Sequence, residues 1–164
     1  MHEIIIAFFE SWPTPLATLV LSAMPIVELR LAIPYAMHVW SMTPGEAFGL
    51  GVLGAMLPLF PLYFGLIRLR EWLSRVAPKL TAPIDRLLDH GKNRLERQYL
   101  RYGAFALFLL AAIPLPLAGV WTSALAAAAL RIPKREAFWS IFLGTLVAGG
   151  IVTALSLTAD VVLQ

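Results

Sequence analysis

Glu28 and Arg30 stand two positions apart in the middle of an otherwise apolar stretch, residues 15–43. A carboxyl group in apolar surroundings takes up a proton more readily than one in water, and a guanidinium group grips phosphate or carboxylate oxygens with its planar fork. Ionisable groups at membrane depth are costly and usually face a cavity or one another. The pair is therefore a candidate for a substrate or ion pathway; the alternative is that it only satisfies loop backbone or reaches toward the interface.

A second candidate group follows a Pro-Leu-Pro sequence in the later apolar stretch, residues 103–130. Proline breaks helical hydrogen bonding, and non-helical backbone at membrane depth is tolerated where it lines a cavity. Trp121 would supply an apolar wall and Thr122 a small polar contact, although these residues could equally only shape a turn. The candidate pathway residues are Pro25, Glu28, Arg30, Pro34, Pro114, Pro116, Gly119, Trp121 and Thr122.

Residues for other chemistries are absent from the sequence or scattered through it. The chain has no cysteine, and its three histidines (His2, His38 and His90) show no spacing typical of a metal site. No nucleophile–base pair is visible either. We therefore expect no metal, no cofactor and no enzymatic activity.

The composition places the candidate residues in a membrane protein. Of 164 residues, 59% are hydrophobic and 14% are charged, whereas an ordinary soluble domain has about 25% charged residues. A chain of this length cannot hide so much apolar surface from water. Lipid must therefore be the solvent for much of it, which excludes a soluble enzyme, a soluble nucleic-acid binder and a disordered chain.

The charges are unevenly distributed along the chain. Residues 1–46 carry a net charge of −3, whereas residues 68–101 hold nine basic and four acidic side chains, and residues 131–136 add a net +2. Because basic loops stay in the cytoplasm, we expect residues 68–101 to be cytoplasmic and the N-terminus to lie outside. The mostly helical spacing of apolar residues in 68–101 is typical of an amphipathic segment on anionic headgroups, and less so of nucleic-acid binding.

Two uncharged segments, residues 47–67 and 137–159, are long enough to span a bilayer core. Pro58 and Pro61 are expected to kink the first of them. The two stretches that contain the candidate residues instead divide at their prolines into limbs of about 11–14 residues. Limbs of that length are too short to span and suit re-entrant hairpins, which enter and leave on one side.

The two halves of the chain resemble each other. LSAMP at 21–25 matches LAAIP at 110–114, and TPGEAFGLGVLG at 43–54 matches IPKREAFWSIFLG at 132–144. If both proline-containing stretches crossed the membrane, the chain would have four transmembrane helices, and the basic residues 131–136 would lie on the side opposite to residues 68–101. Two re-entrant hairpins place both basic regions inside, in agreement with the positive-inside rule. The repeats are then inverted, which is a signature of transporters.

These patterns predict an all-α integral membrane protein, built as an inverted repeat of a re-entrant helical hairpin plus a transmembrane helix, with amphipathic interfacial helices. A single membrane domain covers residues 1–164. The first repeat, 1–67, contains an N-terminal interfacial helix, a hairpin at 15–43 and a transmembrane helix at 44–67; the linker is 68–101; the second repeat, 102–164, contains a hairpin at 103–130 and a transmembrane helix at 133–160.

ELRLAIP at 28–34 and IPLPLAGVWTSALAA at 113–127 resemble the signature stretches of the small multidrug export proteins. That family is distantly similar to the DedA/VTT membrane proteins, which include lipid scramblases. The resemblance extends over nearly the whole chain and implies an inverted-repeat fold with two re-entrant hairpins and a transport role. Three departures stand out: Leu31 replaces a usual glycine, Leu117-Ala118-Gly119 replaces Gly-Thr-Gly, and the DedA arginine of the second hairpin is missing, with Arg131 only at its exit.

We therefore expect a multi-pass protein of the inner (cytoplasmic) membrane. It would move a lipid-linked or other anionic amphiphile, or a small solute, through a site between two opposed hairpins, with proton coupling through Glu28 as an addition. The expected partners are membrane lipids, the substrate and a second copy of the chain in a homodimer, with no nucleic acid. The alternative is a non-transporting membrane organiser or assembly protein, which a charge pair that tolerates substitution would favour.

Overall fold

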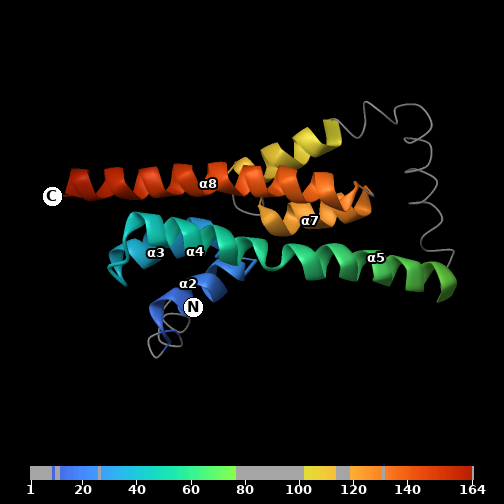
Figure 1. Cartoon of the computed structure of the whole chain (residues 1–164), viewed down its shortest axis with the longest axis horizontal. Coiled ribbons are helices and arrows are strands. Elements are labelled where there is room, and N and C mark those ends of the chain that lie inside the picture. Colours follow the sequence, from blue (N-terminus) through green and yellow to red (C-terminus); the bar gives the residue numbers. More distant parts are fainter. Residues whose placement is uncertain are drawn as a thin grey trace. The chain divides into compact units, whose positions relative to one another are not determined.

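The computed structural model describes residues 9, 12–25, 27–76, 102–113, 119–130 and 132–163, and every regular element in them is an α-helix (Figure 1). The prediction of an all-helical protein is thus confirmed for this part of the chain. The predicted N-terminal interfacial helix and the linker beyond residue 76 lie outside it. The helices are α2 (Thr14–Ala23), α3 (Glu28–His38), α4 (Pro44–Met56), α5 (Leu59–Val76), an unlabelled helix Tyr102–Ala112, α7 (Val120–Ala129) and α8 (Lys134–Leu163).

Two helical segments are long and apolar enough to cross a membrane, Pro44–Gly65 with 22 residues and Lys134–Ala159 with 26. At 1.5 Å per residue they measure about 33 and 39 Å, against a hydrocarbon core of about 30 Å. They agree with the two transmembrane helices predicted from the sequence. The first comprises α4 and the beginning of α5, and α5 continues past residue 67 to Val76.

The predicted kink at Pro58 is present as a break between α4 and α5. Leu57 donates its N–H to the carbonyl of Gly54, three residues earlier, at 3.1 Å, instead of continuing the helical pattern. Pro58 and Pro61 have no N–H to donate to the carbonyls four residues before them. The helix resumes when the N–H of Leu62 reaches the carbonyl of Pro58 at 3.0 Å.

The start of α4 is fixed by a capping box that its sequence encodes. The side chain of Thr43 accepts a hydrogen bond from the N–H of Glu46 at 3.3 Å, and the Glu46 carboxylate accepts one from the N–H of Thr43 at 3.1 Å. Pro44 occupies the first helical position, where its missing N–H costs nothing. Thr-Pro-Gly-Glu is therefore a local start signal for this helix.

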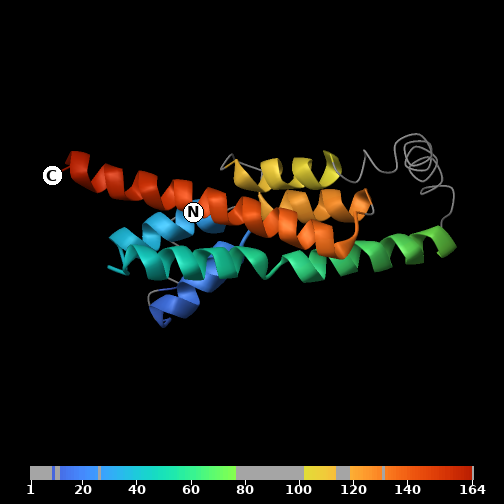
Figure 2. The ribbon, with the colours of Figure 1, turned by 45° about the horizontal axis from the view of Figure 1, so that its top comes forward.

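The chain forms two compact units, one of Met1–Leu57 with Leu146–Gln164 and one of Pro58–Thr145. In the first unit, α2 and α3 have 10 and 11 residues, about 15 to 17 Å, and are too short to cross a bilayer core. They pack against each other and both pack against α4 (Figures 1 and 2). The stretch 15–43 thus divides into two short limbs, as expected from its prolines.

A glycine brings α2 and α4 into close contact. A Cβ atom at Gly54 would collide with the backbone carbonyl oxygen of Leu19 and lie 2.9 Å from the Cβ of Ser22. The hydroxyl of Ser22 donates a hydrogen bond to the carbonyl of Gly51 in the same interface. Small residues allow this kind of backbone approach between helices in membranes.

The second unit has a contact of the same kind. A Cβ atom at Gly144 of α8 would lie 2.5 Å from the carbonyl oxygen of Phe108 and 2.7 Å from the Cβ of Ala111, both in the helix Tyr102–Ala112. Phe108 and Ala111 follow Leu19 and Ser22 by 89 positions, and Gly144 follows Gly54 by 90. In each unit, the helix before the proline break therefore packs closely against a glycine, and the two glycines occupy matching positions in the two halves of the chain.

Candidate functional site

Glu28 begins α3 in a backbone conformation that residues other than glycine rarely adopt. Its φ angle is +47°, in the left-handed region, and its N–H donates to the carbonyl of Met24 at 3.0 Å. The residue follows directly on the connection between α2 and α3, which contains the exposed Pro25. A left-handed conformation at a residue with a long side chain costs of order 1–3 kcal/mol and persists only where the surroundings hold it.

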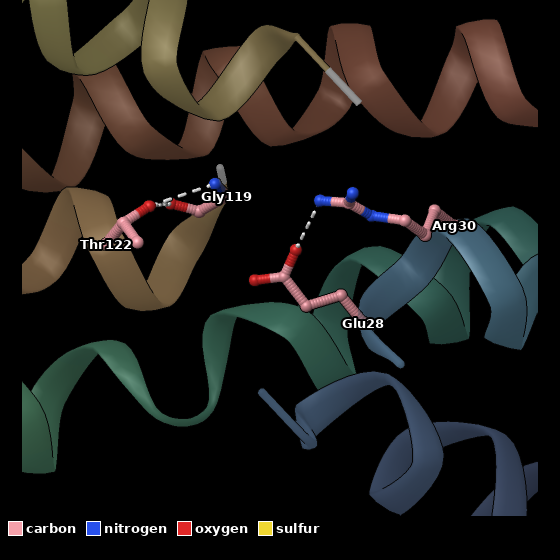
Figure 3. A network of polar contacts seen from close by, with 4 residues as sticks. All are labelled: Glu28, Arg30, Gly119 and Thr122. Atoms are coloured by element: carbon pink, nitrogen blue, oxygen red, sulfur yellow. Dashed lines mark hydrogen bonds and ion pairs between the residues drawn. The ribbon is translucent and has the colours of Figure 1, made fainter. Parts of the chain in front are cut away.

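The left-handed backbone allows Glu28 to pair with Arg30. Nη2 of Arg30 donates to Oε2 of Glu28 at 3.2 Å (Figure 3). Two residues at positions i and i+2 of a regular helix do not face each other. Since the turn of the backbone at Glu28 redirects its carboxylate, the ion pair and the unusual conformation belong together.

Both charged side chains are largely shielded from solvent, with exposed fractions of 9% for Glu28 and 18% for Arg30. A buried charge that loses its partner is strongly destabilising, whereas an intact buried pair contributes little net stability. Stability alone therefore gives no reason to keep this pair. Pro34 lies inside α3, where it removes the N–H that would pair with the carbonyl of Arg30 without ending the helix.

The second candidate group is organised around Gly119, the residue before α7. Its φ and ψ angles of 156° and −158° lie in a region essentially restricted to glycine. The hydroxyl of Thr122 accepts a hydrogen bond from the N–H of Gly119 and donates one to its carbonyl, both at 3.1 Å (Figure 3). Thr122 thus supplies the N3 half of a capping box, since its hydroxyl satisfies the N–H of Gly119.

The hydroxyl of Ser123 is fully buried and is without a hydrogen-bond partner among the residues that the structure describes. A helical serine usually donates to the carbonyl four residues earlier, which here belongs to Gly119. That carbonyl already accepts from the N–H of Ser123 at 3.0 Å and from Thr122. Ser123 is not among the residues predicted from the sequence. The pattern that could have pointed to it is a single serine next to the candidate Thr122 in an alanine-rich helix.

The structure thus pairs Glu28 with Arg30 in the first unit and Gly119 with Thr122 in the second. Trp121 is half-buried in the first turn of α7. Pro114 and Pro116 lie outside the described residues. No group of three or more metal-ligating side chains occurs in the part of the chain that is described.

These features define a helical membrane protein that keeps a partly buried ion pair beside a proline-containing connection. Among protein families, the one described as "Putative small multi-drug export protein" matches residues 28–151, and the chain belongs to it. The family predicted from the sequence is therefore confirmed. The match begins at Glu28 and includes every candidate residue except Pro25. No curated protein and no solved structure matches the chain.

Proposed function

We propose that this protein exports an anionic amphiphile or a small anionic solute across the inner membrane, and that Glu28 and Arg30 lie on the substrate pathway. The family description supports an export role. The observation that carries the proposal is the shielded Glu28–Arg30 pair held by a left-handed backbone. Backbone strain and buried charges that add little stability are typical of functional sites.

The pair has the chemistry of an exchange site. A substrate carboxylate or phosphate would compete with the Glu28 carboxylate for the guanidinium group of Arg30, whose fork suits either anion. Protonation of Glu28 would remove its charge and leave Arg30 for the substrate; loss of that proton would favour release. Proton uptake and substrate binding are then coupled through one residue, in a DedA-like mode of transport.

The same proposal includes an inverted repeat with two re-entrant hairpins. Its support is that both proline-containing stretches flank their breaks with helices of 10 or 11 residues, and that Gly54 and Gly144 seat matching helices in their own units. With both hairpins re-entrant, the basic loop after α5 and the start of α8 lie in the cytoplasm. Homodimer formation remains part of the proposal, since two spanning helices alone bury little surface.

The test is transbilayer movement in vesicles reconstituted with the full-length protein. The probes are a fluorescent phosphatidylglycerol analogue and the cationic dye ethidium. We expect the wild-type protein to accelerate the anionic probe and Arg30→Ala or Glu28→Gln to lose at least tenfold of that rate, while Arg30→Lys keeps part of it. Glu136→Gln, which neutralises an exposed acid at the start of α8, is the matched control for Glu28→Gln.

Three outcomes would overturn the proposal. The first is full transport by a stably inserted Arg30→Ala protein. The second is a wild-type protein that moves neither probe, which would favour the membrane organiser. The third is movement of ethidium alone, which would refute the anionic substrate.

A further inference from the structure

One face of α5 changes from apolar to basic along its length. Phe60, Phe64, Arg68, Trp72 and Arg75 are all exposed, and their spacing of four, four, four and three places them on one side of the helix. Trp72 keeps an exposed fraction of 59%. This order along α5 is expected for a helix face that extends from the hydrocarbon core of a bilayer into its headgroup region.

Two other helices of the same unit repeat this order. On α8, the exposed residues Leu143, Trp139 and Arg135 follow one another at intervals of four toward the start of the helix, where Lys134 is also exposed. On the helix Tyr102–Ala112, the exposed residues Leu109, Phe105 and Tyr102 lead toward its first residue, with Tyr102 exposed at 69%. Tryptophan and tyrosine are enriched at the membrane–water interface.

The exposed aromatic and basic residues of the three helices lie at the same end of the unit. Tyr63 on α5 donates its hydroxyl hydrogen to the carbonyl of Ile132 at 2.7 Å, directly before α8. A Cβ atom at Gly103 would lie 3.2 Å from the Cδ1 atom of the same Ile132. Ile132, just before α8, therefore contacts both the first part of α5 and the start of the helix Tyr102–Ala112.

The register between α5 and α8 places their basic residues at similar levels along the two helices. The two helices run in opposite directions (Figures 1 and 2), and the rings of Phe60 and Phe138 lie 5.9 Å apart. Lys134, four residues before Phe138, is then level with Phe64, and Arg68 is one turn, about 6 Å, farther out. We call Arg68, Trp72, Arg75, Tyr102, Lys134, Arg135 and Trp139 the basic–aromatic end.

Four cations of the basic–aromatic end are exposed: Arg68, Arg75, Lys134 and Arg135. Glu136 is an exposed carboxylate beside Lys134 and Arg135. Arg and Lys at interface depth are complementary to the phosphates of anionic lipids. Arg68 lies one turn from the exposed Phe64 on α5, and Arg135 lies one turn from the exposed Trp139 on α8. Each helix therefore offers an aromatic surface to the acyl chains of a lipid and a basic surface to its phosphate.

We propose that the basic–aromatic end is a binding site for anionic phospholipid headgroups. Arg68, Lys134 and Arg135 contact the phosphate, and Trp139 and Tyr102 lie beside the glycerol region. None of these residues belongs to the proposed transport pathway, so the inference does not depend on what the protein exports. The leaflet that supplies it is the one whose anionic lipids face the basic loops.

The site is tested by titrating the full-length protein in detergent with phosphatidylglycerol or phosphatidylcholine and following the thermal unfolding temperature. We expect phosphatidylglycerol to stabilise the wild-type protein selectively. The triple variant Arg68→Gln/Lys134→Gln/Arg135→Gln should need more of it for the same shift, by roughly fivefold for each residue replaced. The charge-keeping variant Arg68→Lys/Lys134→Arg/Arg135→Lys should retain most of the selectivity.

The matched control removes three arginines from the linker, as Arg94→Gln/Arg97→Gln/Arg101→Gln, and so changes the net charge equally. The proposal requires this control to lose clearly less affinity for phosphatidylglycerol than the triple variant loses. Equal losses in the control and the triple variant would mean general attraction to the basic chain and no site. Equal shifts with phosphatidylcholine and phosphatidylglycerol would also overturn it.

Discussion

The guanidinium group of Arg30 reaches the carboxylate of Glu28 at 3.2 Å although the two residues occupy positions i and i+2 of the same helix. In a regular helix these side chains would diverge. The left-handed backbone of Glu28, with φ at +47°, is the local feature that reconciles the two facts. The stability contributions of the backbone conformation and of the ion pair can be tested by different substitutions at these two residues.

The backbone contribution is tested by comparing two neutral replacements at the same position. Glu28→Gln and Glu28→Val both remove the charge, but a β-branched side chain tolerates positive φ poorly. We expect Glu28→Val to be less stable than Glu28→Gln by about 1–3 kcal/mol. Denaturant unfolding in detergent measures the difference; equal stabilities would contradict the left-handed conformation.

The ion pair is tested by a double-mutant cycle. Arg30→Met leaves the shielded carboxylate of Glu28 without this cation and should destabilise the protein by roughly 3 kcal/mol. Adding Glu28→Gln removes the carboxylate charge, so the double variant should recover much of that loss. If the two single effects simply add, the residues do not interact energetically.

The glycine contacts give a third prediction, with controls in the same helices. Gly54→Ala and Gly144→Ala should each destabilise the protein by about 1–3 kcal/mol, because the new methyl group meets backbone atoms of the packed helix. Gly49→Ala and Gly150→Ala place a methyl group in open space. These two should be neutral or stabilising by up to about 1 kcal/mol, since alanine favours helix. Thermal unfolding separates the two pairs, and similar values for all four would contradict the close packing.

The link between Tyr63 and Ile132 gives a fourth prediction. Tyr63→Phe keeps the ring and removes the hydroxyl that donates to the carbonyl of Ile132. Because that carbonyl is buried, its loss of a donor should cost about 1–2 kcal/mol. The matched control is Tyr102→Phe, whose exposed hydroxyl should contribute nothing measurable to unfolding. A neutral Tyr63→Phe variant would mean that water replaces the bond.

Local signals predicted much of the helical architecture. The uncharged runs located both spanning segments, and Pro58 marked the break between α4 and α5. Each of these depends on residues close together in the sequence. Their physical cause is a length of apolar chain or a missing N–H, and both can be recognised without knowing the fold.

Other features of the candidate site depend on the fold and were not predictable from local patterns. The sequence marked Glu28 and Arg30 as unusual but gave no sign of the positive φ that joins them. The unpartnered hydroxyl of Ser123 depends on which carbonyls are already occupied. The bond from Tyr63 to Ile132 connects residues 69 positions apart, a separation that no period of apolar residues reveals.

The proposal as a whole depends most on both proline-broken stretches returning to the side from which they came. Single cysteines at Ser41, Arg86, Lys134 and Gln164 test this, because the chain has no cysteine of its own. Lys134 is chosen because it is exposed, whereas its neighbour Ile132 is fully buried. The reagent is a membrane-impermeant maleimide applied to intact cells and again after permeabilisation. We expect labelling of 41 and 164 in intact cells and of 86 and 134 only after permeabilisation; labelling of 134 with protection of 164 would mean four plain spans and would contradict the opposed hairpins.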